Sequence, residues 1–487
     1  MPKTLRERTI SGMIWNAMER FGGSLFLFIS NLVLARLLSP DDFGCVGMLL
    51  VFISVSDAVV DGGFGSALIQ KKNPTAIDYS TVFYWNILLS FFLYGILYLS
   101  SPIIADFYRI PLLSDVLKMQ GIVLLFNAFT LVQQNVLKKQ IAFKKIAKIN
   151  LSAIVIGTCT GILFAFAGFG VWCLVIKSLT TALVQCIIYW TSSHWRPQWV
   201  FSWVSFKSLF RFGSFVFFTS IVNTLYANII SLIIGKSFSA ITLGYYTQAR
   251  KLEDIPRQSL SAVVQNVTFP VFSQMQDNLN QLREAMRKCL KALAFITFPL
   301  MLLMFIIAEP LFLLLFTEKW RPSVPYFQIL CMYGYIMVII ELNGNVLKSL
   351  GEGKFFLLAR TLQKVIGILL VLGGLKWGMK GLLAGYVLSQ YVGFIILTTV
   401  SGRVIQYGTL QQMKDLFPIF IISITTAAIT YFLTSLLSGA HYLILLAFGI
   451  VVYIVIYLIS AKVLHLESFK LFSQILKNKI YEKRIVI

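Results

Sequence analysis

Apolar runs long enough to cross a lipid bilayer recur along the whole of this 487-residue chain. Clear examples are 83–99, 151–166 and 419–437, and the polar segments between successive runs are too short to form a soluble domain. About 20 apolar residues cross the hydrocarbon core as a helix. A helix satisfies its backbone polar groups internally, which lipid-exposed backbone requires. The sequence therefore predicts an all-α integral membrane protein.

Fourteen transmembrane helices are predicted, and the composition agrees, with 57% hydrophobic and only 13% charged residues. The predicted spans are 11–36, 43–68, 79–101, 112–135, 147–168, 169–190, 207–235, 241–271, 292–309, 325–347, 355–377, 380–400, 415–437 and 441–462. We interpret the basic N-terminal segment as the start of a retained span, because the run after it is too long and too polar for a cleavable signal.

The formal charge of +22 would suggest a nucleic-acid partner in a soluble protein. In a membrane protein the placement of lysine and arginine decides the orientation. With both termini inside, most of these residues fall in the predicted cytoplasmic segments, for example at 138–148 and 283–291. We therefore predict a multi-pass inner-membrane protein with N and C termini in the cytoplasm, in contact with anionic membrane lipids and not with nucleic acid.

Neither the cysteines nor the histidines form a pattern that binds metal. The six cysteines include no CxxC pair and lie mostly within apolar runs, and the three histidines are isolated. The sequence therefore predicts no metal site, no disulfide and no bound cofactor.

The eighth span is too polar to be recognised from hydropathy. It has five charged residues close together: Arg250, Lys251, Glu253, Asp254 and Arg257. The basic segments 196–211 and 283–291 should both face the cytoplasm, so an even number of spans must lie between them. Since 207–235 is one, 241–271 must be the other. A charged helix is tolerated in a membrane only against protein or a water-filled cavity.

The charges of this span fall on one helical face, because Arg250, Asp254 and Arg257 are at positions i, i+4 and i+7. Two interpretations are open. The stripe lines an aqueous cavity, or the arginines and Asp254 neutralise one another in a structural network. Pro256 predicts a kink near the middle of the helix.

Other charged residues within predicted spans have two interpretations as well. Glu19 and Arg20 are adjacent in span 1, and Lys177 in span 6 either binds an anion or pairs with an acid on a neighbouring helix. Asp57 and Asp61 in span 2 either carry a proton or cation, or mark a helix end solvated from the cytoplasm. Spans 1, 2 and 8 are thus candidate walls of one cavity.

The stretch ARLLSPDDFG (35–44) carries a helix-start signal between the first two spans. Ser39 is suited to cap the helix, Pro40 to its first position, and two aspartates to the positive end of its dipole. GKSFSAITLG (235–244) follows span 7 and repeats the basic residue, the serine and the glycine at the same spacing. We predict a capped turn at the outer face and two parallel six-helix repeats.

The predicted organisation is two pseudo-symmetric six-helix lobes around a central cavity, with two extra helices. The expected boundaries are 1–190 for the first lobe, 191–206 for a cytoplasmic linker, 207–400 for the second lobe, 401–462 for spans 13 and 14, and 463–487 for an amphipathic tail.

Several motifs resemble those of a known transporter family. LARLLSPDDFG and GFGSALIQKKN in the first half, and LGYYTQARKLEDIP and NVTFPVFSQMQDN (266–278) in the second, are similar to the paired motifs of polysaccharide flippases. These are the Wzx-type members of the multidrug/oligosaccharidyl-lipid/polysaccharide exporter superfamily. The resemblance covers nearly all of the chain.

The resemblance implies a transporter, and not an enzyme, that flips a polyprenyl-diphosphate-linked oligosaccharide across the bacterial inner membrane, coupled to H⁺ or Na⁺. A polysaccharide polymerase and chain-length machinery are candidate partners. Candidate residues for binding the anionic substrate are Arg20, Lys177, Arg250, Lys251 and Arg257. Candidates for ion coupling are Glu19, Asp57, Asp61, Glu253 and Asp254.

Two other functions are alternatives. A cation-coupled drug or metabolite exporter of the same superfamily fits a cavity with acids and bases, although clustered arginine and lysine favour an anionic substrate. A membrane glycosyltransferase or polymerase fits less well, because the longest interior gap, 272–291, is short and the acidic pair Asp41 and Asp42 is explained by helix capping.

Overall fold

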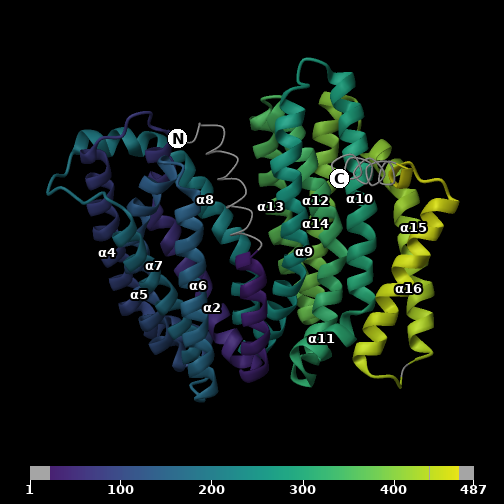
Figure 1. Ribbon diagram of the computed structural model, residues 1–487, viewed down its shortest axis with the longest axis horizontal. Coiled ribbons are helices and arrows are strands. Elements are labelled where there is room, and N and C mark those ends of the chain that lie inside the picture. Colours follow the sequence, from purple (N-terminus) through teal and green to yellow (C-terminus); the bar gives the residue numbers. More distant parts are fainter. Residues whose placement is uncertain (1–21, 438, 471–487) are drawn as a thin grey trace, which may run out of the picture. The chain divides into compact units, whose positions relative to one another are not determined.

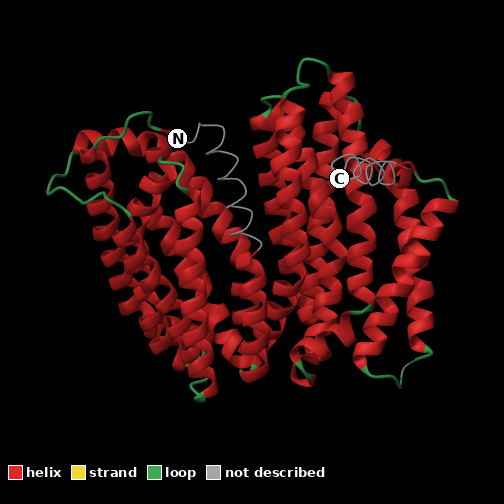
Figure 2. Ribbon diagram, in the orientation of Figure 1, coloured by secondary structure: helices red, strands yellow, loops and turns green. Residues whose placement is uncertain are grey.

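The protein is all-helical in the part of the chain that the computed structural model describes, residues 22–437 and 439–470 (Figure 2). Among these described residues, eleven helical segments are long and apolar enough to cross a membrane. The chain divides into two compact units, Met1–Thr247 and Gln248–Ile487. Figure 1 labels the helices of each unit.

Unit 1 begins, in its described part, with the helix Gly22–Leu37. It continues with α2 (Pro40–Asp61), α3 (Phe64–Gln70), α4 (Ala76–Tyr108), α5 (Leu112–Lys139), α6 (Phe143–Phe166), α7 (Trp172–Ser192) and α8 (Trp203–Ser237). The main packed pairs are α4 with α5, α6 with α7, α5 with α7, and α2 with α8. The predicted lobe boundaries place α8 in the second lobe, and those boundaries remain a prediction.

Helix α9 (Ala240–Ser273) starts in unit 1 and continues into unit 2. The rest of unit 2 is α10 (Leu279–Ile306), α11 (Ala308–Phe316), η1 (Glu318–Ser323), α12 (Val324–Ser349), α13 (Gly353–Gly374), η2 (Leu375–Trp377), α14 (Gly378–Ile405), α15 (Thr409–Ser435) and α16 (Tyr442–Val463). Helix α12 is largely buried and packs against both α10 and α14. Helices α15 and α16 pack together as a pair (Figure 1).

The start of α2 confirms the predicted cap. Ser39 accepts a hydrogen bond from the Asp42 backbone N–H at 3.3 Å, and the Asp42 carboxylate accepts one from the Ser39 N–H at 2.9 Å. This is a reciprocal capping box with Pro40 in the first turn. At the second hinge the Thr242 N–H donates to the Ser239 hydroxyl at 3.1 Å. Both hinges thus use a serine cap bonded to the residue three positions later.

Predicted span 2 differs from the structure, because the helix breaks before its end. Gly62 and Gly63 have φ of 53° and 72°, and α3 starts after them. The left-handed region is accessible to glycine without steric cost. A β-carbon at Gly63 would lie 2.2 Å from the carbonyl oxygen of Gly213 in α8. The break therefore allows close contact between two backbones.

The helix at predicted span 9, α10, is longer than expected. It was predicted to start at residue 292, whereas α10 begins at Leu279. The first turns carry charged residues, which hydropathy excludes from a span but which a helix tolerates on an exposed face. Buried Leu282 and Met286 on the other face show that this extension is packed.

Candidate functional site

The most deeply buried charge in the described residues of α9 is Glu253, whose exposed fraction is 0%. The Arg257 Nε lies 3.1 Å from Glu253 Oε1, and the Tyr333 hydroxyl donates to Glu253 Oε2 at 3.3 Å. Arg257 also forms an ion pair with Asp254. One guanidinium thus contacts two carboxylates of its own helix, and a tyrosine of α12 completes the shell around the buried one.

The packing of α12 makes room for this carboxylate. A β-carbon at Gly334 would lie 2.8 Å from Glu253 Oε1 and 2.8 Å from the Met301 sulfur of α10. Tyr333 is itself held against Tyr386 of α14, with ring centroids 5.1 Å apart. The charged group is therefore enclosed by three other helices of unit 2. An unpaired charge there would be costly, and the Arg257 contact offsets that cost.

The pairing of Arg257 with Asp254 agrees with the structural interpretation of the charged stripe. The central residue is nevertheless Glu253, which lies outside the predicted stripe of Arg250, Asp254 and Arg257. The spacing of Glu253 and Arg257 is i, i+4 with the acid first, which is the favourable order for a helical ion pair and could have identified them. Lys251 is exposed and Arg250 is half-buried. The structure does not test the binding roles of these residues.

The two acids of α2 lie in unit 1, one turn apart. Asp57 accepts a hydrogen bond from Asn127 Nδ2 of α5 at 2.9 Å. Asp61 is the last residue of α2, and a β-carbon at Gly65 would lie 2.9 Å from Asp61 Oδ1 and 3.0 Å from Asn135 Nδ2. Each carboxylate is therefore close to an asparagine of α5. The position of Asp61 agrees with the helix-end interpretation, and a role in ion coupling remains a prediction.

Lys177 lies between helices in unit 1 and is half-buried. Its ammonium donates to the Ser30 hydroxyl at 2.9 Å, and Ser30 is within 3.4 Å of the Thr158 hydroxyl. Within the described residues, the Lys177 ammonium therefore contacts a hydroxyl group of the helix Gly22–Leu37. The other candidates of span 1, Glu19 and Arg20, lie outside the described residues.

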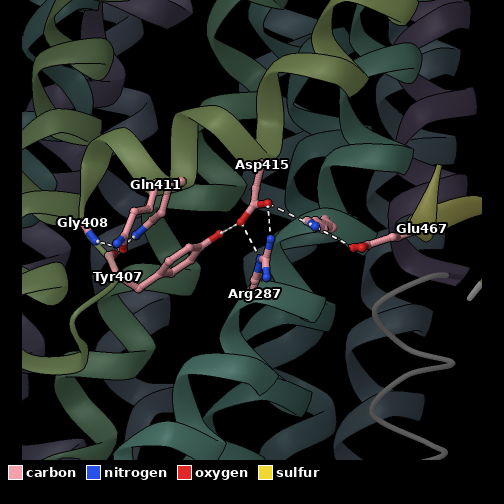
Figure 3. Close-up of polar contacts among 8 residues, drawn as sticks. Arg287, Tyr407, Gly408, Gln411, Asp415 and Glu467 are labelled. Carbon is pink, nitrogen blue, oxygen red and sulfur yellow. Dashed lines mark hydrogen bonds and ion pairs between the residues drawn. The ribbon is translucent and has the colours of Figure 1, made fainter. Parts of the chain in front are cut away.

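A second charged cluster joins three parts of unit 2 (Figure 3). Asp415 of α15 accepts hydrogen bonds from Arg287 Nε at 2.7 Å and Nη2 at 2.9 Å, and from the Tyr407 hydroxyl at 2.7 Å. Lys291 bridges Asp415, at 3.1 Å, and Glu467, at 2.6 Å. The bidentate arginine is the stronger form of this contact.

This cluster was missed from the sequence. Arg287 and Lys291 were treated only as cytoplasmic charges, although their i, i+4 spacing places both on one face of α10. Asp415 is an isolated acid at the predicted start of span 13, and Tyr407 lies in the connection between α14 and α15. The contact between Asp415 and Arg287 joins residues 128 positions apart, so no local pattern indicates it.

No metal centre is present among the described residues, where no group of three or more histidine, cysteine, aspartate or glutamate side chains could hold an ion. The six cysteines, all in described segments, are free thiols. The charged clusters described above, around Glu253 and Asp415, consist of arginine, lysine, carboxylate and tyrosine groups.

The fold is shared with solved transporters. The lipid II flippase MurJ in an inward closed conformation superposes with a TM-score of 0.74, at 16% identity over 93% of this chain and 99% of that one. An inward-facing MATE-family multidrug transporter gives a TM-score of 0.62 at 16% identity, covering 81% and 98% of the two chains. The class is therefore a multi-pass membrane protein with the fold of these flippase and multidrug-transporter structures.

The family follows from sequence. The model of a family described as "Polysaccharide biosynthesis protein" matches residues 33–325, and the chain belongs to this family of Wzx-type flippases. It is 26% identical to the lipopolysaccharide biosynthesis protein WzxC of Escherichia coli (strain K12) over 90% of this chain and 89% of that protein. It is 27% identical to the teichuronic acid biosynthesis protein TuaB of Bacillus subtilis (strain 168), over 72% and 73%.

A third relative is the succinoglycan biosynthesis transport protein ExoT of Rhizobium meliloti (strain 1021), 24% identical over 72% of each chain. These relatives are bacterial proteins of polysaccharide biosynthesis. The protein is a transporter of polysaccharide biosynthesis and not an enzyme.

Proposed function

We propose that the protein flips a polyprenyl-diphosphate-linked oligosaccharide from the cytoplasmic to the outer leaflet of the bacterial inner membrane. The observation that carries the proposal is the charge that α9 leaves accessible: Lys251 is exposed, and Arg250 and Arg257 are half-buried. A helix with this many charges is unsuited to lipid and suited to the wall of a polar path. The relatives in lipopolysaccharide, teichuronic acid and succinoglycan biosynthesis indicate the class of cargo.

The chemistry of such a cargo requires a protein path. A diphosphate and several sugars cannot enter a hydrocarbon core of roughly 30 Å without losing hydration that nothing in lipid replaces. Arginine and lysine offer charge-assisted hydrogen bonds to phosphate oxygens. Arg250, Lys251 and Lys177, with Arg20, are the proposed contacts.

We propose a role for Arg257 other than the substrate contact predicted from the sequence. Since its guanidinium already contacts Glu253 and Asp254, we assign it to positioning the Glu253 carboxylate. Glu253 is then the leading candidate for ion coupling, because protonation would remove the charge that holds Arg257. The other coupling candidates are Glu19, Asp57, Asp61 and Asp254.

The proposed topology has fourteen spans with both termini in the cytoplasm. Among the described residues, the eleven long apolar segments include Gly353–Ile405, which holds both α13 and α14. Two further candidates are the helix Gly22–Leu37, which is apolar but too short in its described part to be counted, and α9, which is too charged to be counted. These helices support fourteen crossings and, with them, the two predicted six-helix repeats. A polymerase and chain-length machinery would act on the flipped unit as candidate partners.

Deletion of the gene in its own host tests the function. We expect lipid-linked repeat units to accumulate in the cytoplasmic leaflet, where an enzyme added to the outside of spheroplasts cannot reach them. Normal surface glycan without accumulation would contradict the proposal.

Substitution in α9 tests the residues in the same host. Arg250→Gln and Lys251→Gln should each lower flipping about tenfold, through loss of one charged contact to phosphate. Lys354→Gln, at an exposed lysine of α13, is the matched control for loss of one positive charge. Flipping at the wild-type rate in both α9 variants, at equal protein level, would remove these residues from the proposal.

A further inference from the structure

A pocket of about 480 Å³ lies in unit 1 at the ends of three membrane helices. Its walls are the α3–α4 connection, the first turn of α4, the C-terminal end of α5 and the segment after α7. The principal lining residues are Lys72, Asn73, Tyr79, Lys139, Gln140 and Trp195. The volume falls within the range of small-ligand sites. The α3–α4 wall is the end of the GFGSALIQKKN motif, which the proposed transport activity does not use.

The lining carries positive charge and no acid. The nearest acid on α4, Asp78, is 1% exposed and already forms an ion pair with Lys71 at 2.7 Å. Lys139 donates to the carbonyl oxygens of Ile69 and Lys71, which places its ammonium at the wall. Lys72 is exposed beside it. The pocket therefore has an uncompensated positive potential, which favours an anion.

Neutral donors accompany the two lysines. Tyr79 and Trp195 lie with ring centroids 6.0 Å apart, and Trp195 also packs on Phe83 at 5.7 Å. The buried Trp195 indole N–H has no hydrogen-bond partner among the described residues. Because that nitrogen has almost no accessible surface, it lies behind the wall and not in the pocket. The amide groups of Asn73 and Gln140 supply the neutral donors at the wall.

Unit 2 also has a pocket. The elements that line it hold places in the order of the second predicted repeat that match those of the unit 1 pocket in the first. This second pocket, of about 330 Å³, is lined by the first turns of α10, by the α14–α15 connection and by the first turns of α15. In the predicted repeats, α10 corresponds to α4, and the α14–α15 connection corresponds to the α7–α8 connection. In unit 2, however, the Asp415 carboxylate itself supplies the negative charge, because it pairs with Arg287 and Lys291. The lining of the unit 1 pocket has no such internal carboxylate.

The position of the unit 1 pocket indicates where its anion comes from. Candidate spans end at Lys139 and begin at Ala76, so the pocket lies at the depth of lipid headgroups. We propose that this pocket binds a phosphate group carried by a membrane lipid, with Lys72 and Lys139 as the cationic contacts and the amide groups of Asn73 and Gln140 as neutral donors. The phosphate belongs either to an anionic phospholipid or to a polyprenyl diphosphate. The inference concerns a binding site and not transport, so either proposal can fail alone.

The test measures lipid binding to the purified full-length protein by native mass spectrometry. The probes are phosphatidylglycerol, undecaprenyl diphosphate and, as a phosphate-free control, diacylglycerol. The variants are Lys72→Gln and Asn73→Ala, with Lys148→Gln as the matched control, since Lys148 is an exposed lysine of α6 outside the pocket. All four proteins should have the same melting temperature, which excludes a folding defect.

We expect Lys72→Gln to weaken phosphate-lipid binding about tenfold and Asn73→Ala to weaken it severalfold, through loss of one charged and one neutral hydrogen bond. Weakening with both phosphate lipids supports general headgroup recognition, and weakening with undecaprenyl diphosphate alone supports the glycan carrier as the source. Equal binding by the Lys72→Gln and Lys148→Gln proteins, or diacylglycerol binding as tight as phosphatidylglycerol, would overturn the proposal.

Discussion

Gly44 packs directly against Ala240, and a β-carbon at Gly44 would lie 1.8 Å from the Ala240 carbonyl oxygen. The contact is reciprocal, because a β-carbon at Gly244 would lie 1.9 Å from the Pro40 carbonyl oxygen. The two hinges that share a sequence pattern therefore touch each other within unit 1, glycine to backbone in both directions. The match between ARLLSPDDFG and GKSFSAITLG reflects a shared packing requirement.

This contact predicts that a single methyl group at either glycine is destabilising. Gly44→Ala and Gly244→Ala should each lower the free energy of unfolding by about 1–3 kcal/mol, the usual range for overpacking. Thermal unfolding of the detergent-solubilised protein measures the effect. Gly95→Ala is the control, since nothing lies within 4 Å of a β-carbon at that position of α4. A loss for Gly95→Ala as large as that for Gly44→Ala would show that the contact is not the cause.

Because Glu253 and Arg257 are paired, we expect the effect on stability of replacing one of them to depend strongly on whether the other is present. Arg257→Gln leaves the Glu253 carboxylate buried without its cation, and we expect a loss of about 3–5 kcal/mol in stability. Adding Glu253→Gln removes the unpaired charge, so the double variant should recover much of that loss. A double-mutant cycle on the unfolding free energy measures the coupling. Additive effects of the two substitutions would contradict the paired geometry.

We predict that the contacts of Asp415 are the main attachment of the start of α15 to α10. Asp415→Asn weakens the contacts to Arg287 and Lys291 while keeping the size of the side chain. Hydrogen exchange of residues 409–418 should increase at least tenfold, as expected from a loss of about 1.5–3 kcal/mol for a charged hydrogen bond. Tyr407→Phe removes only one hydroxyl contact and should have a smaller effect. If the two variants exchanged equally, the ionic contacts would not be the main attachment.

We expect the contact between Glu467 and Lys291, which lies beyond the last membrane helix, to depend on pH. The hydrogen bond from Lys291 holds the pKa of this carboxyl below its usual value. A depressed pKa means that the contact contributes fully above the unfolded-state pKa, about 4.3 for glutamate, and is lost as the pH falls through the lower folded-state value. Protection factors at 466–470 should fall over that range. Glu467→Gln should show the low-pH behaviour at pH 7, and unchanged protection would contradict the contact.

Much of the fold was predictable because it depends on short-range chemistry. The bounds of α13 and α16 lie within a few residues of the predicted spans 355–377 and 441–462, since the length of an apolar run determines where a helix can cross lipid. The Ser39 cap was predictable because all its partners lie within three residues. Even the charged α9 could be predicted, from the parity of the basic segments on either side of it.

The candidate site was predicted only in part. The sequence singled out Arg250, Asp254 and Arg257 by their spacing, but the burial of Glu253 depends on Tyr333, 80 positions away, and on the missing side chain of Gly334. The contact of Asp415 with Arg287 and the break of α2 beside Gly213 likewise depend on residues that are far apart in the sequence. The sequence alone determined which segments are helices and which of them are too charged for lipid, because these properties reside in each segment. Only the tertiary structure decided which charges are paired and buried, because pairing depends on which distant helices pack together.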